Sequence, residues 1–246
     1  LTGGTKNDTI DGAGGQDAID GKGGADHISG GAANDTITIG SKTEFTSTVG
    51  TDTIDGGAGV DTITWTGAMN MEAASLSTIS NTEIWSIAAG SDFTISDAVL
   101  TNNPGVTFVF AGAGTLSGGE DTAGAALMTE AISFTATGGD YAMKLIGSSG
   151  DDVYTFDATG TLTAADTIDG NAGTDTIQLE NNTSATDSTG NAVTAVIGAN
   201  AKGLEKIVVL DQADADYAGN ATLTIDSGYT DTTLTIDASA LDTDPT

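Results

Sequence analysis

Apolar residues recur at a fixed interval of nine at the start of the chain. Residues 3–38 divide into four nonapeptides: GGTKNDTID, GAGGQDAID, GKGGADHIS and GGAANDTIT. Each carries an isoleucine at its eighth position, after a glycine-rich stretch; these are Ile10, Ile19, Ile28 and Ile37. The three residues around each isoleucine are too few for an independent strand. The pattern therefore predicts short strands, joined by turns, that stack on copies of themselves.

The sixth position of each nonapeptide is acidic, and its residues are Asp8, Asp17, Asp26 and Asp35. If two nonapeptides form one coil, successive coils lie about 4.8 Å apart. Asp8 then stacks on Asp26 and Asp17 on Asp35, while Ile10 stacks on Ile28 and Ile19 on Ile37 inside. Ca²⁺ takes about 6–8 oxygen ligands. The predicted ligands are these carboxylates and the loop carbonyls of the first-position glycines, Gly3, Gly12, Gly21 and Gly30.

The period breaks after residue 39 and then returns. Nine residues beyond Asp35 lies Glu44, but the next aspartate is Asp52, which predicts a widened turn or an insertion between residues 38 and 51. DTIDGGAGVDTI (52–63) and DTIDGNAGTDTI (166–177) then differ at only two positions. They add the predicted calcium ligands Asp52, Asp61, Asp166 and Asp175, with the carbonyls of Gly56 and Gly170.

Two weaker echoes extend the set of candidate ligands. GSSGDDVYTF (147–156) follows the plan of GGAANDTITI (30–39), which adds Asp152 and the Gly147 carbonyl. NTEIWSI (81–87) and GLEKIVV (203–209) each place a glutamate before alternating apolar residues. The alternative for these two glutamates is pairing with the backbone or with Lys206. The further candidates are Glu44, Asp151, Glu83 and Glu205.

The echoes recur at similar offsets, which predicts tandem units. The predicted domains are an N-terminal β-roll (1–39), a first irregular unit (40–146) with calcium turns at 52–64, and a second, related unit (147–246) with turns at 147–155 and 166–178. Alternating Thr, Ile, Val and Phe predict longer strands elsewhere, at 92–96, 106–110, 131–137, 222–226 and 233–239. One short helical turn is expected within 120–130. The predicted fold is all-β, a right-handed parallel β-solenoid with wider, irregular coils.

Charge narrows the partners. The 246 residues contain 35 acids and six lysines, without arginine, for a net charge of −29. A surface of this sign excludes nucleic acid and favours cations, which would relieve the self-repulsion. The chain has no cysteine, which excludes disulfides and thiolate metal sites, and no apolar run as long as a membrane span. Trp65 and Trp85 are expected in the core.

The nonapeptides follow G-G-x-G-x-D-x-U-x, and at these residues the chain resembles the RTX (hemolysin-type) calcium-binding repeat family. The resemblance implies a β-roll stabilised by several Ca²⁺ ions and secretion by the type I route. The remaining strands are similar in style to those of bacterial RTX surface-layer (S-layer) proteins. Ala13 and Lys22 at the second position, and Lys6 and Ala33 at the fourth, depart from the family pattern, so strain or weaker binding is expected there.

These observations predict a secreted structural protein whose folding and self-assembly depend on calcium. It would form a layer or filament at the bacterial cell surface, with copies of itself as partner and cell-surface polysaccharide as a second partner. The alternatives are a stalk or binding segment of an RTX adhesin, a non-catalytic RTX appendage and a polysaccharide-active β-helix enzyme. No catalytic residue is predicted, because the only histidine, His27, stands at the solvent-facing seventh position.

Overall fold

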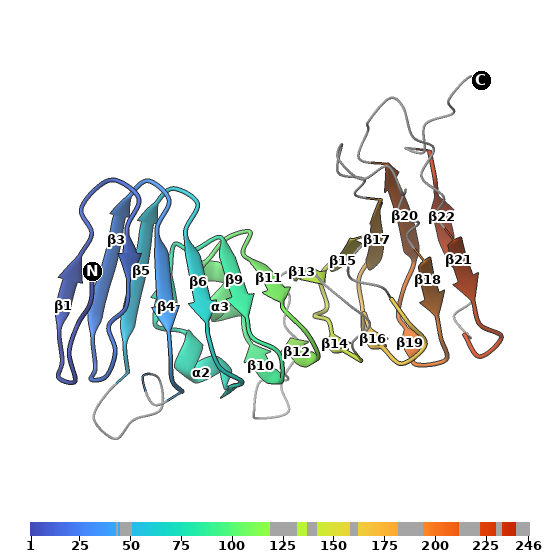
Figure 1. Ribbon diagram of the computed structural model, residues 1–246. Coiled ribbons are helices and arrows are strands. Elements are labelled where there is room, and N and C mark those ends of the chain that lie inside the picture. The colour runs from blue at the N-terminus through green and yellow to red at the C-terminus, as the bar shows by residue number, and fades with distance from the viewer. Residues whose placement is uncertain are drawn as a thin grey trace, which may run out of the picture. The chain divides into compact units, whose positions relative to one another are not determined.

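The computed structural model describes residues 1–42, 44, 51–118, 132–136, 142–157, 162–181, 194–211, 222–229 and 233–239. The chain forms two compact units, unit 1 (Leu1–Glu130) and unit 2 (Ala131–Thr246). The fold is an all-β solenoid of stacked parallel strands, as predicted (Figure 1). The division at residues 39 and 146 comes from sequence echoes and stays a prediction.

Unit 1 stacks its strands in three parallel sheets. The first contains β1 (Thr9–Asp11), β3 (His27–Ala32), β5 (Thr53–Ala58) and β8 (Ile79–Ser80), in that order. The second contains β2 (Ala18–Ile19), β4 (Thr36–Ile39), β6 (Thr62–Trp65), β9 (Ile84–Ile87) and β11 (Thr107–Phe110). The third contains β7 (Asn70–Met71), β10 (Ser91–Ile95) and β12 (Gly114–Gly118).

The strand register confirms the 18-residue coil and shows where it widens. Ile10 pairs with Ile28, and Ile19 with Ile37, as the nonapeptide period predicts. The next step pairs Ile28 with Ile54 across 26 residues. The extra residues fall in the predicted insertion. Between residues 41 and 51, the structure describes only residues 41, 42, 44 and 51.

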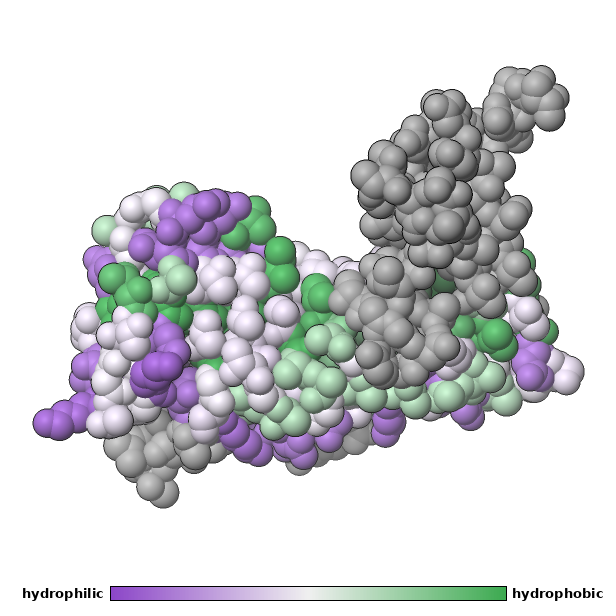
Figure 2. Space-filling view, viewed as in Figure 1, coloured by the Kyte–Doolittle hydropathy of each residue, from purple (hydrophilic) through white to green (hydrophobic). Residues whose placement is uncertain are grey.

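The core of unit 1 consists of columns of inward side chains. One column runs through Ile19, Ile37, Ile63, Trp85 and Phe108, all at most 1% exposed. Trp85 contacts Phe108 with ring centroids 5.3 Å apart. Because strand residues alternate between faces, the Thr and Ser residues between these side chains face outward. Figure 2 shows hydrophilic residues of unit 1 over the upper edge of its first coils and again along its lower edge.

Unit 2 repeats this plan. One sheet contains β13 (Ser133–Ala136), β15 (Val153–Asp157), β17 (Thr176–Asn181), β20 (Lys206–Asp211) and β22 (Thr235–Asp237). A second contains β14 (Lys144–Ile146), β16 (Thr167–Asp169) and β19 (Ala201–Lys202), and β18 (Thr194–Ile197) pairs with β21 (Thr222–Ile225). The five longer strands predicted outside the calcium turns are therefore confirmed. The outward-facing His27 and the buried Trp65 and Trp85 are confirmed as well.

Two short helices of unit 1 have described bounds, and the sequence pattern predicts neither. They are α2 (Ala73–Leu76) and α3 (Asp97–Asn102), and each is a single turn or slightly more. Such helices are held by tertiary contacts rather than by their own propensity. Asn103, which is fully buried, supports the end of α3 by donating from Nδ2 to the Val99 carbonyl oxygen at 2.8 Å. The helical turn expected within 120–130 lies outside the described residues.

Candidate calcium-binding turns

The sixth-position aspartates join neighbouring coils through their own carboxylates. In unit 1, Oδ1 of Asp26, Asp35, Asp52 and Asp61 accepts a hydrogen bond from the backbone N–H of the counterpart one coil earlier. Asp35 Oδ1 accepts from Asp17 N at 2.8 Å, and Asp61 Oδ1 accepts from Asp35 N at 2.8 Å. On the other edge, Asp26 Oδ1 accepts from Asp8 N at 2.9 Å. We call such a row a carboxylate ladder, and it confirms that the predicted aspartates stack.

Unit 2 contains the same arrangement. Asp175 Oδ1 accepts from Asp152 N at 2.8 Å, and Asp152 Oδ1 accepts from Ile132 N at 2.7 Å. Asp166 begins the row on the other edge, where its Oδ1 accepts from Met143 N at 2.8 Å. The ladder geometry therefore recurs in both units, although the residue that donates to the first carboxylate is no longer an aspartate.

The second oxygen of most ladder carboxylates is buried and has no hydrogen-bond partner among the described residues. This applies to Oδ2 of Asp17, Asp26, Asp35, Asp52, Asp61 and Asp175. A buried acceptor without a donor typically costs about 1–3 kcal/mol, and more when it is charged. Six such oxygens at equivalent positions are consistent with a ligand that the protein itself does not provide.

The first-position glycines show what lies beside these oxygens. A Cβ on Gly30 would contact the Gly56 carbonyl oxygen and would stand 2.6 Å from Asp35 Oδ2. A Cβ on Gly12 would likewise contact the Gly30 carbonyl oxygen and stand 2.8 Å from Asp17 Oδ2. Only glycine fits between two coils at this point, because a carboxylate oxygen and a carbonyl oxygen from the next coil converge there. Neutral carbonyls with a carboxylate are the ligands that Ca²⁺ prefers.

The glycine-rich loops adopt left-handed backbone at two fixed positions. In the turns at residues 12–17, 21–26, 30–35, 56–61 and 170–175, the second and fourth residues all have positive φ. Four of these residues are not glycine: Ala13 (φ 65°), Lys22 (φ 70°), Ala33 (φ 82°) and Asn171 (φ 65°). This conformation costs about 1–2 kcal/mol for a residue with a Cβ. The strain expected at Ala13, Lys22 and Ala33 is therefore present, but Lys6 has no positive φ.

Burial raises the pKa of several of these carboxylates, so they ionise less readily. It raises the pKa of Asp52 to about 6 and that of Asp175 to about 7. It also raises the pKa of Asp61, with the charges of Glu83 and Asp35 adding to the effect. A bound cation reverses this situation because it stabilises the charged form. A cation bound in these turns would therefore keep the buried carboxylates in their charged form.

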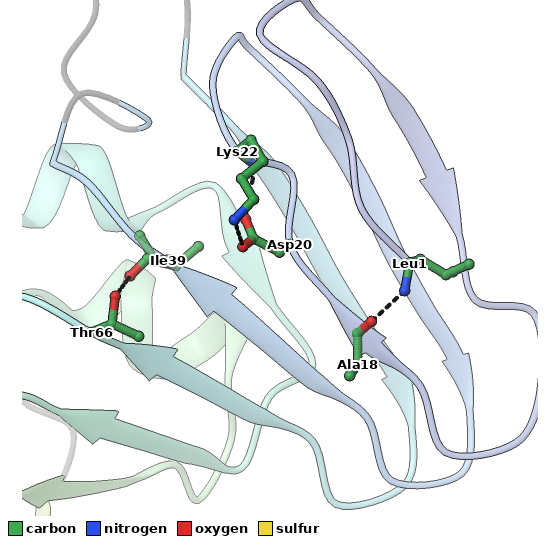
Figure 3. A network of polar contacts seen from close by, with 6 residues as sticks. All are labelled: Leu1, Ala18, Asp20, Lys22, Ile39 and Thr66. Atoms are coloured by element: carbon green, nitrogen blue, oxygen red, sulfur yellow. Dashed lines mark hydrogen bonds and ion pairs between the residues drawn. The ribbon is translucent and has the colours of Figure 1, made fainter.

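Two lysines beside the calcium-type turns form ion pairs with other acids. Lys22 Nζ lies 2.5 Å from Asp20 Oδ2 (Figure 3), and Lys202 Nζ lies 2.5 Å from Asp169 Oδ2. Both aspartates stand at the ninth position, beyond the strand, where the lysine side chains are largely exposed. Surface pairs of this kind contribute little to stability. The ion pairs in these coils thus leave the sixth-position oxygens to another partner.

Comparison with protein families identifies the repeats. The model of the RTX calcium-binding nonapeptide repeat matches four times, over residues 1–28, 11–40, 46–64 and 162–181. The chain carries RTX repeats. Their cofactor is Ca²⁺, and the several copies imply several ions. Searches of curated proteins and of solved structures found no match to this chain.

The RTX turns fit calcium through the backbone more than through clustered side chains. Among the described residues, no group of three or more His, Asp or Glu side chains is close enough to hold a metal. Each ion would therefore rely on loop carbonyls together with one or two carboxylates, as the sequence predicts. Asp17, Asp26, Asp35, Asp52, Asp61 and Asp175 meet this requirement through their free Oδ2 atoms. Their role as ligands stays a prediction.

Glu83 and Glu205 end the ladders instead of extending the RTX turns. Glu83 Oε2 accepts from Asp61 N at 2.7 Å, and Glu205 Oε2 accepts from Asp175 N at 2.8 Å. The longer side chain reaches the donor from a coil without a nonapeptide loop. Both residues thus show the backbone pairing that is the alternative to calcium binding. Glu44 is buried, which raises its pKa to about 7, and its carbonyl oxygen accepts from Asp52 N at 3.0 Å.

The fifth position of the RTX turns carries a second set of contacts that the sequence pattern alone does not indicate. The side chain at this position accepts a hydrogen bond from a backbone N–H of the following coil. The bonds run to Asn7 Oδ1 from Ala25 N, to Asn34 Oδ1 from Val60 N, and to Asp151 Oδ1 from Thr174 N, at 2.7–3.0 Å. The available signal is the Asn or Asp that precedes the sixth-position aspartate in these three turns. Asp151 therefore has a backbone partner through Oδ1, and its role as a calcium ligand stays a prediction.

Proposed function

We propose that this chain is a secreted structural protein that folds with calcium and assembles with copies of itself into a cell-surface layer or extracellular filament. One observation carries the proposal: among the described residues, six buried carboxylate oxygens at equivalent positions on the stacked coils have no hydrogen-bond partner. RTX repeats are typical of extracellular secreted proteins. Among the described residues, no helix is both long enough and apolar enough to cross a bilayer.

Calcium would act by neutralising the carboxylates and fixing the loops. In its absence, the ladders place like charges one coil apart, about 4.8 Å. In its presence, each ion would join a carboxylate to carbonyls of the neighbouring coil, and the energy of binding would contribute directly to folding. A chain of charge −29 would thus remain loose at low calcium and become ordered outside the cell.

An exposed apolar residue of unit 2 supports self-assembly. Ile236 on β22 is 50% exposed although it continues the column of the fully buried Ile207. An apolar side chain exposed in this way offers a surface against which another copy of the chain can pack. We therefore propose that such surfaces meet between copies.

Composition supports a non-catalytic role. The chain has no cysteine and one histidine, and that histidine is exposed. The nonapeptide solenoid is typically a calcium-binding structural element.

Electron microscopy with calcium, and again with excess EGTA, tests the proposal. We expect sheets or filaments with calcium and dispersed chains without it. Ile236→Lys should suppress the assemblies, because it places a charge on the exposed apolar surface of β22. Val60→Lys should not suppress them, because Val60 is similarly exposed (47%) but lies in a turn. Dispersed monomers at millimolar calcium would reject self-assembly, and monomers that bind cells or glycans would favour the adhesin stalk.

A further inference from the structure

The turns at the sixth-position aspartates have two different shapes. The five turns with positive φ at their second and fourth residues, which we call open turns, end at Asp17, Asp26, Asp35, Asp61 and Asp175. In every one of them, the aspartate Oδ2 is buried without a hydrogen-bond partner among the residues described. Backbone shape and unsatisfied carboxylate therefore occur together in both units.

The turn at residues 147–152 has the other shape. Neither Ser148 nor Gly150 has a positive φ. Ser148 N donates to Asp152 Oδ2 at 2.7 Å, and Ser148 Oγ donates to Asp152 Oδ1 at 2.9 Å. Oδ1 also accepts from Ile132 N at 2.7 Å. Both oxygens of this fully buried carboxylate thus have donors from the protein.

A second hydroxyl closes the turn before β16 in the same way. Thr163 N donates to Asp166 Oδ2 at 2.7 Å, and Thr163 Oγ1 lies within hydrogen-bonding distance of the same oxygen at 3.2 Å. Asp166 Oδ1 accepts from Met143 N at 2.8 Å. In the turn at residues 3–8, Gly4 N donates to Asp8 Oδ2 at 2.6 Å, but that turn has no hydroxyl donor in its second position.

We infer that Ser148 and Thr163 take the place of an ion, so that Asp152 and Asp166 are structural carboxylates and calcium binds at the open turns. A carboxylate that accepts two or three hydrogen bonds is stabilised in its charged form. Burial still raises the pKa of Asp152, while its hydrogen bonds with Ile132 and Ser148 act in the opposite direction. Both of its oxygens already have donors from the protein, whereas Asp175 Oδ2, one coil away, has none among the described residues. The inference rests on the proposed calcium-dependent folding and divides the acids into two classes.

Ser148 is the residue that decides the class of its turn. Residues 147–152 read GSSGDD and depart from G-G-x-G-x-D only at Ser148. Ser148→Gly removes the hydroxyl donor and permits the left-handed backbone of the open turns. The variant should therefore acquire a calcium site that the natural chain does not have. Ser148→Ala removes the same hydroxyl but retains a Cβ, so it should not acquire one.

Counting bound ions tests the inference. The full chain and its variants are equilibrated with calcium, dialysed against a defined free concentration, and analysed for calcium per chain. Asp175→Asn should bind at least one ion fewer than the wild type, Asp152→Asn the same number, and Ser148→Gly at least one more. Circular dichroism of each variant in calcium checks that the β structure is retained.

The outcomes separate the inference from the proposed function. If the wild type binds no calcium, the proposed function fails. If the wild type binds calcium but Asp152→Asn loses as many ions as Asp175→Asn, only the inference fails. It fails equally if Ser148→Gly binds no more calcium than Ser148→Ala. This last pair decides the question even if Asp152→Asn does not fold.

Discussion

Units 1 and 2 build the same kind of coil but satisfy its carboxylates differently. In the described part of unit 1, five aspartates leave Oδ2 without a partner, whereas in the described part of unit 2 only Asp175 does so. Asp152 and Asp166 of unit 2 accept instead from the backbone and hydroxyls of Ser148 and Thr163. The same sequence of glycine, acid and strand thus satisfies its carboxylate in two ways. In one, an oxygen is left for a cation, and in the other, the protein itself donates hydrogen bonds to both oxygens.

Calcium removal should produce the largest difference between the units. We expect excess EGTA to abolish amide protection in β4 and β6 of unit 1, while β14 and β15 of unit 2 retain a larger share of theirs. The reason is that unit 1 contains more carboxylates without protein donors. Hydrogen exchange read by mass spectrometry gives both units in one sample. Equal loss of protection across the two would remove the distinction.

The two tryptophans provide an optical control for that experiment. Trp65 and Trp85 are at most 1% exposed and both belong to unit 1. Their emission should shift to the red when EGTA is added and return when calcium is restored. Magnesium at the same concentration should not restore it, because Mg²⁺ requires stricter octahedral geometry and gives up its water reluctantly.

A smaller effect is expected from single glycines of unit 1. Gly30→Ala should destabilise the calcium-bound chain by about 1–3 kcal/mol, because a new methyl group must displace its surroundings. Its Cβ would contact the Gly56 carbonyl oxygen and Asp35 Oδ2, 2.6 Å away. Gly14→Ala is the matched control, since its Cβ would meet no atom within 4 Å. The midpoint of urea unfolding measures both, and equal midpoints would contradict the convergence of oxygens at Gly30.

The smallest effect should be that of pH on the calcium-free chain. The folded-state pKa is about 6 for Asp52 and about 7 for Asp175, against an ordinary value of 3.8. A raised folded pKa means that stability is greatest below the ordinary value and is lost as pH rises toward about 7. Stripped of calcium, the chain should therefore be more ordered at about pH 5 than at about pH 8, and urea should unfold it less readily at the lower pH. Greater resistance at the higher pH would reverse the sign of the argument.

Much of the fold follows from one period, and the reason is geometric. A single isoleucine per nonapeptide fixes which residue faces inward, so the pairs Ile10–Ile28 and Ile19–Ile37 can be predicted from the sequence alone. The widening to 26 residues between Ile28 and Ile54 is visible there only as an interruption. The buried Asn103 at the end of α3 also donates from Nδ2 to the Ile79 carbonyl oxygen at 3.0 Å, a tertiary contact that leaves no local pattern.

The candidate site can be predicted in outline but not in its classes. Most aspartates of the ladders follow glycine-rich loops, so the sequence pattern places them together at the edges of the coils. The pattern does not show that Ser148 closes its turn, because Ala13, Lys22 and Asn171 are also non-glycine residues at the second position and still adopt positive φ. The difference lies in a hydroxyl that reaches Asp152, which depends on backbone shape rather than on residue type alone.

The 18-residue spacing of the first ladders also limits how the chain can change in length. At this spacing, the backbone N–H of Asp8 donates to Asp26 Oδ1, and the backbone N–H of Asp17 donates to Asp35 Oδ1. A duplication of 18 residues here would insert one complete coil and leave every neighbouring contact type intact. A duplication of half that length would exchange the two edges and send each later strand to the opposite sheet. The solenoid can therefore lengthen by whole coils, whereas inserting half a coil would change the pairing of every strand beyond it.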